Sequence, residues 1–241
     1  MKDESYSNRL FKSYQKTHGD NGINSQAAHE FFELYYASYF QKYFNQYDKG
    51  ASILEIGCNA GYMIKIFENH GYRNVIGIDL SPDDIEYANK HVGGGKCFLI
   101  DAFEYLSTNT KKFDIIYSRA MMEHIEKNRI LEFLELVNNS LIEGGIALIE
   151  VPNMDWIWAS HERYMDFTHE VGFTKESLRQ IMRNFFDDVN IEYTNDSKRF
   201  HKVRILLARL IVGSLLYSAE PCIPKEAFWA RCILGVGKKH I

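Results

Sequence analysis

The sequence has few of the features that mark proteins outside the ordinary globular class. Only four cysteines occur among 241 residues, with no CxxC pair and no zinc-ligand spacing, so we expect free thiols in a reducing compartment. The formal net charge is −4, so no overall basic excess draws the chain to nucleic acid, and we expect no such partner. A GxSxG motif is also missing, which removes support for a serine hydrolase.

Long hydrophobic runs are missing as well. The first residues, MKDESYSNRL, are charged and polar, unlike a secretory signal. The longest apolar stretch, residues 205–217, contains Arg209 and is shorter than the about 20 residues that cross a bilayer. We therefore expect a cytoplasmic protein without a transmembrane helix. What is present is ordinary for a folded domain, with 46% hydrophobic and 25% charged residues.

From Ser52 onward, short β-branched runs alternate with helical patterns. Strands are predicted at 52–56, 75–79, 96–100, 113–117, 145–151, 186–193 and 230–236, and helices at 62–70, 82–91, 130–141 and 174–184. This βαβ rhythm predicts an α/β fold with a doubly wound, mostly parallel seven-stranded sheet and helices on both faces. Residues 153–172 interrupt the rhythm and are predicted to form an active-site loop.

We divide the chain into a core with additions. Residues 1–50 are a helical extension or lid, 51–194 are the core, 195–227 are a helical insertion, and 228–241 hold the final strand. Nine aromatic residues between positions 31 and 47 repeat every four positions, which predicts a stripe on one helix. That stripe either packs on the sheet or lines an acceptor pocket with its tyrosines, among them Tyr36.

A glycine turn follows the first predicted strand. In EIGCNAG, Gly57 and Gly61 form a tight turn before a helix, where backbone can approach a ligand. Asp79 ends the second strand, where an acid can receive ribose hydroxyls. Glu55, just before the turn, is unsuited to a pyrophosphate but attracts a ligand with ammonium and sulfonium charges. This pattern favours S-adenosylmethionine over a dinucleotide.

The chain resembles the class I S-adenosylmethionine-dependent methyltransferases, which have a Rossmann-like fold. The matching segments are EIGCNAG at 55–61, GIDLSP around Asp79, the pair Asp101-Ala102, FDIIYSRAMMEHI and SLIEGGIALIEVPN. Asn59 stands where many members have glycine, and asparagine tolerates left-handed backbone. The residues that the resemblance assigns to cofactor binding are Glu55, Gly57, Cys58, Asn59, Gly61, Asp79, Leu80, Asp101, Ala102, Ser118 and Arg119.

The resemblance also implies a role for each part of this set. Glu55 and the two glycines surround the methionine part, and Asp79 binds the ribose hydroxyls. Leu80 packs on adenine, while Asp101, with Ala102 beside it, accepts a hydrogen bond from the adenine amino group. Ser118 and Arg119 close the floor near the sulfonium. The product would be S-adenosylhomocysteine.

Two histidines lie where an acceptor would sit, His124 after the fourth strand and His169 after the fifth. Histidine has the unperturbed pKa best suited to a base near neutral pH. Each also has a structural interpretation, since His124 could orient the start of a helix and His169 could belong to a loop network. Around His169, Asp166 is a further catalytic candidate, and Arg163 and Tyr164 are candidate substrate contacts.

The D-x-T-H segment followed by FTxxSL resembles a subgroup of these methyltransferases encoded with bacterial surface-polysaccharide pathways. It implies an acceptor oxygen on a sugar or a sugar-borne substituent. The alternatives are a small aromatic or lipid-like, quinone-type acceptor, or a cofactor-binding partner subunit without activity. No metal is expected, because the one adjacent Asp pair of the second half, Asp187-Asp188, begins a strand away from the predicted mouth.

Residues 198–217 combine basic and apolar side chains without an acid. Such a helix can lie on an anionic membrane, here the inner face, or bury its apolar side in a homodimer or within the chain. The sequence does not decide between these three interpretations.

Overall fold

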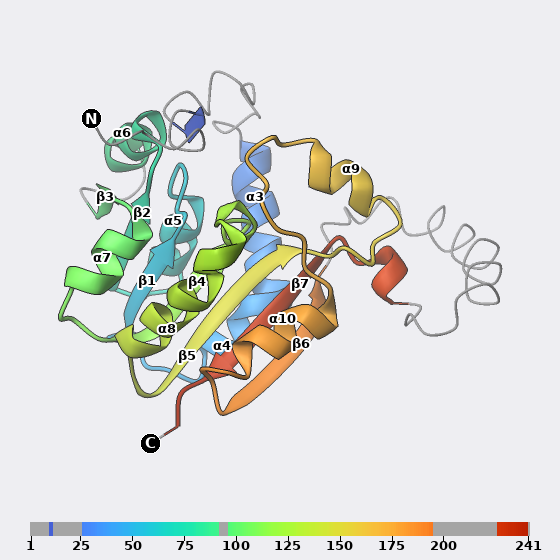
Figure 1. Cartoon of the computed structure of the whole chain (residues 1–241). Helices are drawn as coiled ribbons and strands as arrows, with labels where there is room; N and C mark the ends of the chain where they lie inside the picture. Colours follow the sequence, from blue (N-terminus) through green and yellow to red (C-terminus); the bar gives the residue numbers. More distant parts are fainter. Residues whose placement is uncertain (1–9, 12–25, 92–95, 195–225, 241) are drawn as a thin grey trace, which may run out of the picture.

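A computed structural model of the chain describes residues 10–11, 26–91, 96–194 and 226–240 (Figure 1). The predicted insertion, apart from 226–227, and the part of the predicted extension before residue 26, apart from 10–11, therefore lie outside the described residues. Within the described ranges, Cys58, Cys97 and Cys232 are free thiols. No helix in these ranges combines the length and the apolar character needed to span a bilayer.

Seven strands form one sheet in the order β3-β2-β1-β4-β5-β7-β6. Their bounds are β1 Ser52–Ile56, β2 Asn74–Asp79, β3 Cys97–Leu99, β4 Phe113–Arg119, β5 Leu141–Pro152, β6 Asp188–Thr194 and β7 Cys232–Lys238. β1 to β5 pair in parallel, whereas β7 is antiparallel to both β5 and β6. The predicted mostly parallel seven-stranded sheet is confirmed, with the last strand inserted between β5 and β6.

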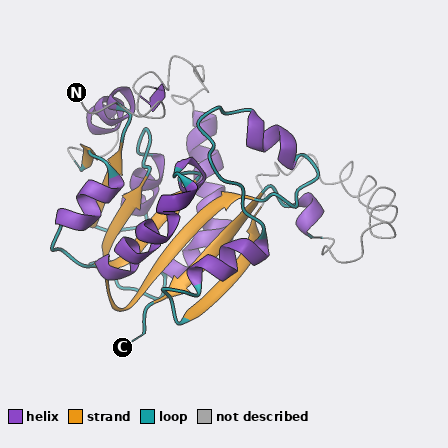
Figure 2. Ribbon diagram, in the orientation of Figure 1, coloured by secondary structure: helices purple, strands orange, loops and turns teal. Residues whose placement is uncertain are grey.

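Helices cover both faces of the sheet (Figure 2). One face carries α7 Ala102–Thr108, α8 Ile130–Ser140 and α10 Lys175–Met182. The other carries α3 Gln26–Tyr35, η1 Tyr36–Phe40, α4 Gln41–Phe44, α5 Tyr62–Asn69 and α6 Pro82–His91. Alternation within β1 supplies both layers, since Ile53 is buried under the second set and Leu54 under the first.

The helix boundaries have local causes. Thr174 and Ser177 form a capping box at the start of α10, each side chain accepting from the other's backbone amide. Asp101 caps α7, a helix that our sequence analysis did not predict. β5 starts at Leu141, directly after α8 and before the glycine pair where we placed its beginning. The predicted loop after β5 also contains a short helix, α9 Ala159–Tyr164.

The aromatic stripe packs on the sheet. Tyr36, Phe40 and Phe44 are all fully buried, and the segment Tyr36–Phe40 is wound as a π-helix. Tyr36 contacts Phe44, Phe67 and His70 edge-on or tilted, so its ring belongs to the core. The prediction that Tyr36 binds an acceptor is wrong, because none of its surface is exposed.

Candidate active site

The candidate site lies at the carboxyl ends of the parallel strands. β1 pairs with β2 on one side and β4 on the other, so the chain reverses its direction of travel across the sheet at β1. A crevice forms outside the strand ends at such a switch point, and ligands bind there in open α/β sheets. Two regions meet at this edge: a cofactor side after β1, β2 and β3, and an acceptor side after β4 and β5.

The glycine turn on the cofactor side has the strained backbone that its sequence predicts. Gly57, Asn59 and Gly61 have φ values of 77°, 46° and 78°, all in the left-handed region. A Cβ on Gly57 would lie 2.9 Å from Cγ of Met121, so the turn packs directly on the segment after β4. The amides of Gly57 and Cys58 both donate to the carbonyl of Ile78, which ties the turn to β2.

Asp79 is held between two loops. Its Oδ2 accepts from the amide of Asn59 and its Oδ1 from the amide of Ser81, each at 2.8 Å. Burial raises the pKa of Asp79 to about 6, although these amides favour the charged form and oppose the shift. Leu80 lies between Asp79 and Ser81 and is partly exposed at this edge. Asp79 is therefore anchored at the end of β2, and its contact with the ribose hydroxyls stays a prediction.

Buried polar atoms without protein partners line the ends of β1 and β4. Glu55 is 4% exposed and Ser118 1% exposed, and neither Glu55 Oε2 nor Ser118 Oγ has a hydrogen-bond partner among the described residues. Burial, helped by Cys97 and Asp79, raises the pKa of Glu55 well above its ordinary value. A cationic ligand next to Glu55 would favour its charged form and offset that burial.

Arg119 is held in place on the adjacent strand. Its Nε lies 3.1 Å from Oε2 of the buried Glu150, whose Oε1 accepts from the hydroxyls of Tyr35 and Thr194. The guanidinium carbon lies 4.9 Å from the ring centre of Tyr35. The positive charge of Arg119 is thus matched by Glu150, so the floor does not repel a sulfonium. Tyr35 and Phe32, rather than Tyr36, are aromatic residues that reach Arg119 at this edge.

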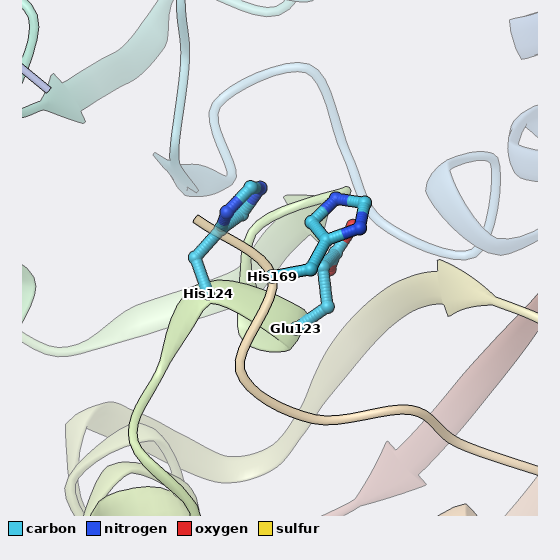
Figure 3. A group of neighbouring side chains, drawn as sticks. All are labelled: Glu123, His124 and His169. Carbon is cyan, nitrogen blue, oxygen red and sulfur yellow. The ribbon is translucent and has the colours of Figure 1, made fainter. Parts of the chain in front are cut away.

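The loop after β5 is fastened to the segment after β4. The carbonyl of Glu123, in η2 Met122–His124, accepts from the amides of Glu170 and Val171 at 2.8 and 3.1 Å. Glu162 in α9 forms a two-pronged ion pair with Arg231, at 3.0 and 3.1 Å. These contacts bring His169 to His124, with ring centres 4.8 Å apart (Figure 3).

A hydrogen-bond chain orients His124. The hydroxyl of Thr168 donates to Oδ1 of Asp166 at 2.6 Å, and the same hydroxyl oxygen lies 2.8 Å from Nδ1 of His124. Because the single hydroxyl proton is directed to Asp166, the oxygen accepts from a protonated Nδ1. Asp166 is buried and so acts on His124 through Thr168. The predicted catalytic candidate Asp166 therefore does not touch His124 in this chain of hydrogen bonds but is linked to it through Thr168.

Of the predicted substrate contacts, Arg163 is used within the loop itself. Its guanidinium donates to the carbonyls of His169 and Glu170, which shapes the turn that presents His169. Arg163 thus organises the loop, and its contact with a substrate stays a prediction. Tyr164 is 79% exposed on α9 and its contact with an acceptor stays a prediction. Asp101 caps α7 with Oδ1, and its predicted adenine contact likewise stays a prediction.

Sequence reasoning missed Glu123, although it stands beside His124 in MMEHI. Its side chain is 2% exposed, and burial, with the nearby Glu150 and Glu162 adding to the effect, raises its pKa to about 8. One potential ligand atom each from Glu123, His124 and His169 lies within 4.8 Å of the others. We expected no metal on the basis of the Asp187-Asp188 pair alone. That pair lies at the start of β6, apart from this cluster.

Comparison with known proteins identifies the class. Residues 28–185 match the family model described as "Methyltransferase domain", and the chain belongs to that family. A phosphoethanolamine N-methyltransferase 3 of Arabidopsis thaliana is 36% identical over 168 residues, which are 64% of this chain and 32% of that protein. A ubiquinone biosynthesis O-methyltransferase of Chelativorans sp. (strain BNC1) is 30% identical over 108 residues, 44% of this chain and 42% of that one. The chain spans less than half the length of these curated relatives.

Solved structures share the fold. A SAM-dependent methyltransferase from Archaeoglobus fulgidus superposes with a TM-score of 0.70 at 22% identity, covering 96% of this chain and 99% of that one. Phosphoethanolamine N-methyltransferase 2 of Haemonchus contortus, solved with phosphomonomethylethanolamine and S-adenosylhomocysteine, gives 0.66 at 18% identity and covers 97% and 60% of the two chains.

The chain therefore belongs to the methyltransferase domain family and has the class I, Rossmann-like fold shared with solved S-adenosylmethionine-dependent methyltransferases. The residues of the cofactor side fit this cofactor, because the unpartnered atoms of Glu55 and Ser118 lie at the ligand edge of the sheet and the glycine turn admits close contact. When bound, the cofactor supplies an electrophilic methyl group on its sulfonium. The chain's own residues have to hold the cofactor and position the acceptor against it.

Proposed function

We propose that the protein transfers the methyl group of S-adenosylmethionine to an oxygen of a sugar or a sugar-borne substituent in surface-glycan synthesis. In this step the carbon–sulfur bond breaks and a carbon–oxygen bond forms. The acceptor hydroxyl loses its proton, and S-adenosylhomocysteine and a methyl ether are the products. The observation that carries the proposal is the pairing of His124 and His169 beside the buried Glu123, next to the glycine turn.

The hydrogen bonds of the two rings support an oxygen acceptor. His124 Nδ1 donates to Thr168, and Nδ1 of His169 lies 2.9 Å from the carbonyl of Glu162, so it is protonated as well. Both Nε2 atoms are then acceptor nitrogens, suited to receive a hydroxyl proton or to hold a hydroxyl in place. A sugar as the source of that hydroxyl is supported by the D-x-T-H and FTxxSL segments, which here build the loop carrying His169.

A small aromatic or lipid-like acceptor is the second candidate. Large apolar side chains are exposed around α9, with Trp158 62% and Phe167 81% accessible near Tyr164. An apolar acceptor could pack against these side chains, whereas a sugar would bury less apolar surface against them. One relative is named a ubiquinone biosynthesis O-methyltransferase, and this name supports a quinone-type acceptor.

An acceptor screen decides between the two candidates. Purified protein with radiolabelled S-adenosylmethionine would be offered nucleotide-sugars and glycan lipids in one set, and phenolic and quinol acceptors in the other. Label transferred to the glycan set supports the proposal, and label confined to the phenolic set replaces it with the second candidate. His169→Ala should bind the cofactor with unchanged affinity and turn over more slowly. Unchanged turnover in this variant would remove His169 from the mechanism.

A further inference from the structure

The side chains of Glu123, His124 and His169 form a cluster suited to a metal ion. They come from η2 and from the loop after β5, and their donor atoms lie within 4.8 Å of one another (Figure 3). Glu123 is 2% exposed, and neither of its carboxylate oxygens has a hydrogen-bond partner among the described residues. A buried polar group without a partner is costly. We infer that these three residues bind a divalent metal ion.

The surroundings of the two histidines match those of metal ligands. A ligating histidine commonly donates its second ring N–H to a carbonyl or a carboxylate, which fixes the tautomer and the orientation of the ring. His169 Nδ1 lies 2.9 Å from the Glu162 carbonyl, and His124 Nδ1 is linked through Thr168 to Asp166. Asp166 Oδ2 lies 4.0 Å from His169 Nε2, which is beyond hydrogen-bonding distance. The tautomers therefore present Nε2 of both rings to the ion.

The donor set selects the kind of ion. Two imidazole nitrogens and one carboxylate oxygen favour ions such as Zn²⁺ or Co²⁺ over Mg²⁺ and Ca²⁺, which prefer all-oxygen sites. Donors at about 2.1 Å from an ion lie at most about 4.2 Å apart. The donors of the present cluster lie within 4.8 Å of one another, so binding one ion would draw them slightly closer together. Three protein ligands leave at least one position open, as in catalytic rather than structural sites.

The open position gives the ion a role on the acceptor side. This role rests on the proposed function, since a Lewis acid there would hold an acceptor hydroxyl and lower its pKa. The histidines would then position the acceptor through the ion instead of taking the proton themselves. Metal binding itself does not depend on the identity of the acceptor and can be measured without it.

The test uses the full chain, stripped of metal with a chelator and titrated with Zn²⁺ by calorimetry and with Co²⁺ by visible absorption. We expect one equivalent per chain and a cobalt spectrum of nitrogen and oxygen ligands. Glu123→Gln and His169→Gln should each weaken binding by more than about 100-fold, beyond the loss expected for an outer-shell partner. The matched controls, Glu126→Gln and His161→Gln, change exposed residues of neighbouring segments and should bind as the wild type does.

Three results would overturn the metal site: no binding to the wild-type protein, equal binding by all variants, or a cobalt spectrum with thiolate charge-transfer bands. Circular dichroism checks that each variant is folded, and if Glu123→Gln does not fold, His169→Gln decides. Failure of the proposed function looks different. An ion bound as described without methyl transfer to any oxygen acceptor would overturn the proposed function alone, and oxygen methylation by a protein that binds no ion would overturn the metal site alone.

Discussion

The cofactor side and the acceptor side of the site are built in different ways. On the cofactor side, Asp79 and Asp101 are fixed by backbone amides, Asp79 by those of Asn59 and Ser81 and Asp101 by the first turn of α7. On the acceptor side, His124 and His169 meet only because the loop after β5 is hydrogen-bonded to η2. The first region is preformed by backbone geometry, whereas the second depends on the docking of a loop.

Asp79 and Glu123 also differ in their hydrogen bonds. Asp79 is partly exposed and accepts two backbone amides, whereas neither carboxylate oxygen of the buried Glu123 has a hydrogen-bond partner among the described residues. Oε2 of Glu55, on the cofactor side, is unpartnered in the same way. A carboxyl group held by fixed donors is organised before its ligand binds, whereas the unpartnered oxygens of Glu55 and Glu123 depend on a ligand to satisfy them.

The largest effect should come from removing the anchor of the cofactor side. Asp79→Ala should weaken S-adenosylmethionine binding by more than about 100-fold, because charge-assisted hydrogen bonds contribute about 1.5–3 kcal/mol each and the glycine turn loses its tie to Asp79. Calorimetry on the purified variant measures this loss. Asp83→Ala, in the exposed first turn of α6, is the control and should bind normally. An unchanged Kd in Asp79→Ala would mean that the ribose is held elsewhere.

The matching change on the acceptor side should leave the affinity for the cofactor unchanged. Thr168→Val keeps the shape of a buried side chain but removes the oxygen between His124 and Asp166. We expect kcat to fall by about 10- to 100-fold, the range seen when outer-shell partners are lost, with an unchanged Kd for S-adenosylmethionine. Steady-state kinetics and calorimetry separate the two. The exposed Thr108→Val is the control. A parallel loss of cofactor affinity would show that the two sides are not independent.

This division explains what could be predicted from the sequence. The strand and helix rhythm and the backbone of the glycine turn were predictable because glycine turns, strand ends and caps are encoded over a few adjacent residues, whereas the binding roles of the cofactor residues stay predictions. On the acceptor side, His124 and the group around His169 were predicted separately, without their contact. Their meeting depends on contacts across 44 positions of sequence, such as Thr168 to His124, which no local pattern encodes. Glu123 was missed because the sequence does not distinguish a buried glutamate from an exposed one.

The aromatic helix shows the same limit on a smaller scale. Spacing by four correctly predicted a packed stripe, yet it could not decide which of Tyr35 and Tyr36 turns toward the site. The π-helical turn Tyr36–Phe40 carries an extra residue per turn and resets the face that follows. Tyr35, the last residue of α3 before this turn, reaches Glu150, while Tyr36 is buried against Phe67.

A change of pH should act on the cofactor side with a definite sign. Because the pKa of Asp79 is about 6, its carboxylate is mostly charged at pH 7 and mostly protonated at pH 5, so S-adenosylmethionine should bind about tenfold more weakly at pH 5. Glu55, with its raised pKa, titrates in the same direction, and Asp79→Asn separates the two by removing the share due to Asp79. Calorimetry between pH 5 and 8 gives the profile. Affinity independent of pH in the wild type would contradict the assignment.

Stability should respond to pH in the opposite sense. The folded protein holds the Asp79 proton more tightly than the unfolded chain, in which the pKa of this carboxyl group is near its ordinary value of 3.8. The contribution of Asp79 to the free energy of unfolding is therefore highest below about pH 4 and falls as the pH rises toward about 6. Denaturant titrations of wild type and Asp79→Asn, compared between pH 4.5 and 7, measure the difference. A wild-type contribution that grows with pH in this window would contradict it.

The smallest effect we predict lies at the contact between the two regions. Gly57→Ala adds a Cβ 2.9 Å from Met121 Cγ at a φ of +77°, whereas Gly144→Ala meets the same unfavourable φ, +79°, with nothing within 4 Å. Both should lose the about 1–2 kcal/mol that left-handed backbone costs a residue with a Cβ. Gly57→Ala should lose about 1 kcal/mol more, because it crowds a packed side chain.

Denaturant unfolding of the two glycine variants isolates that contact, since the shared backbone term cancels in the comparison. Gly57→Ala should also weaken cofactor binding and slow turnover together, because Met121 belongs to the segment that carries Glu123 and His124. Gly144→Ala should change neither. Equal stability losses, with cofactor affinity intact in both, would mean that Met121 yields freely and that the two regions touch without being coupled. A larger loss of stability in Gly57→Ala than in Gly144→Ala would show that the cofactor side and the acceptor side are coupled where Gly57 packs against Met121.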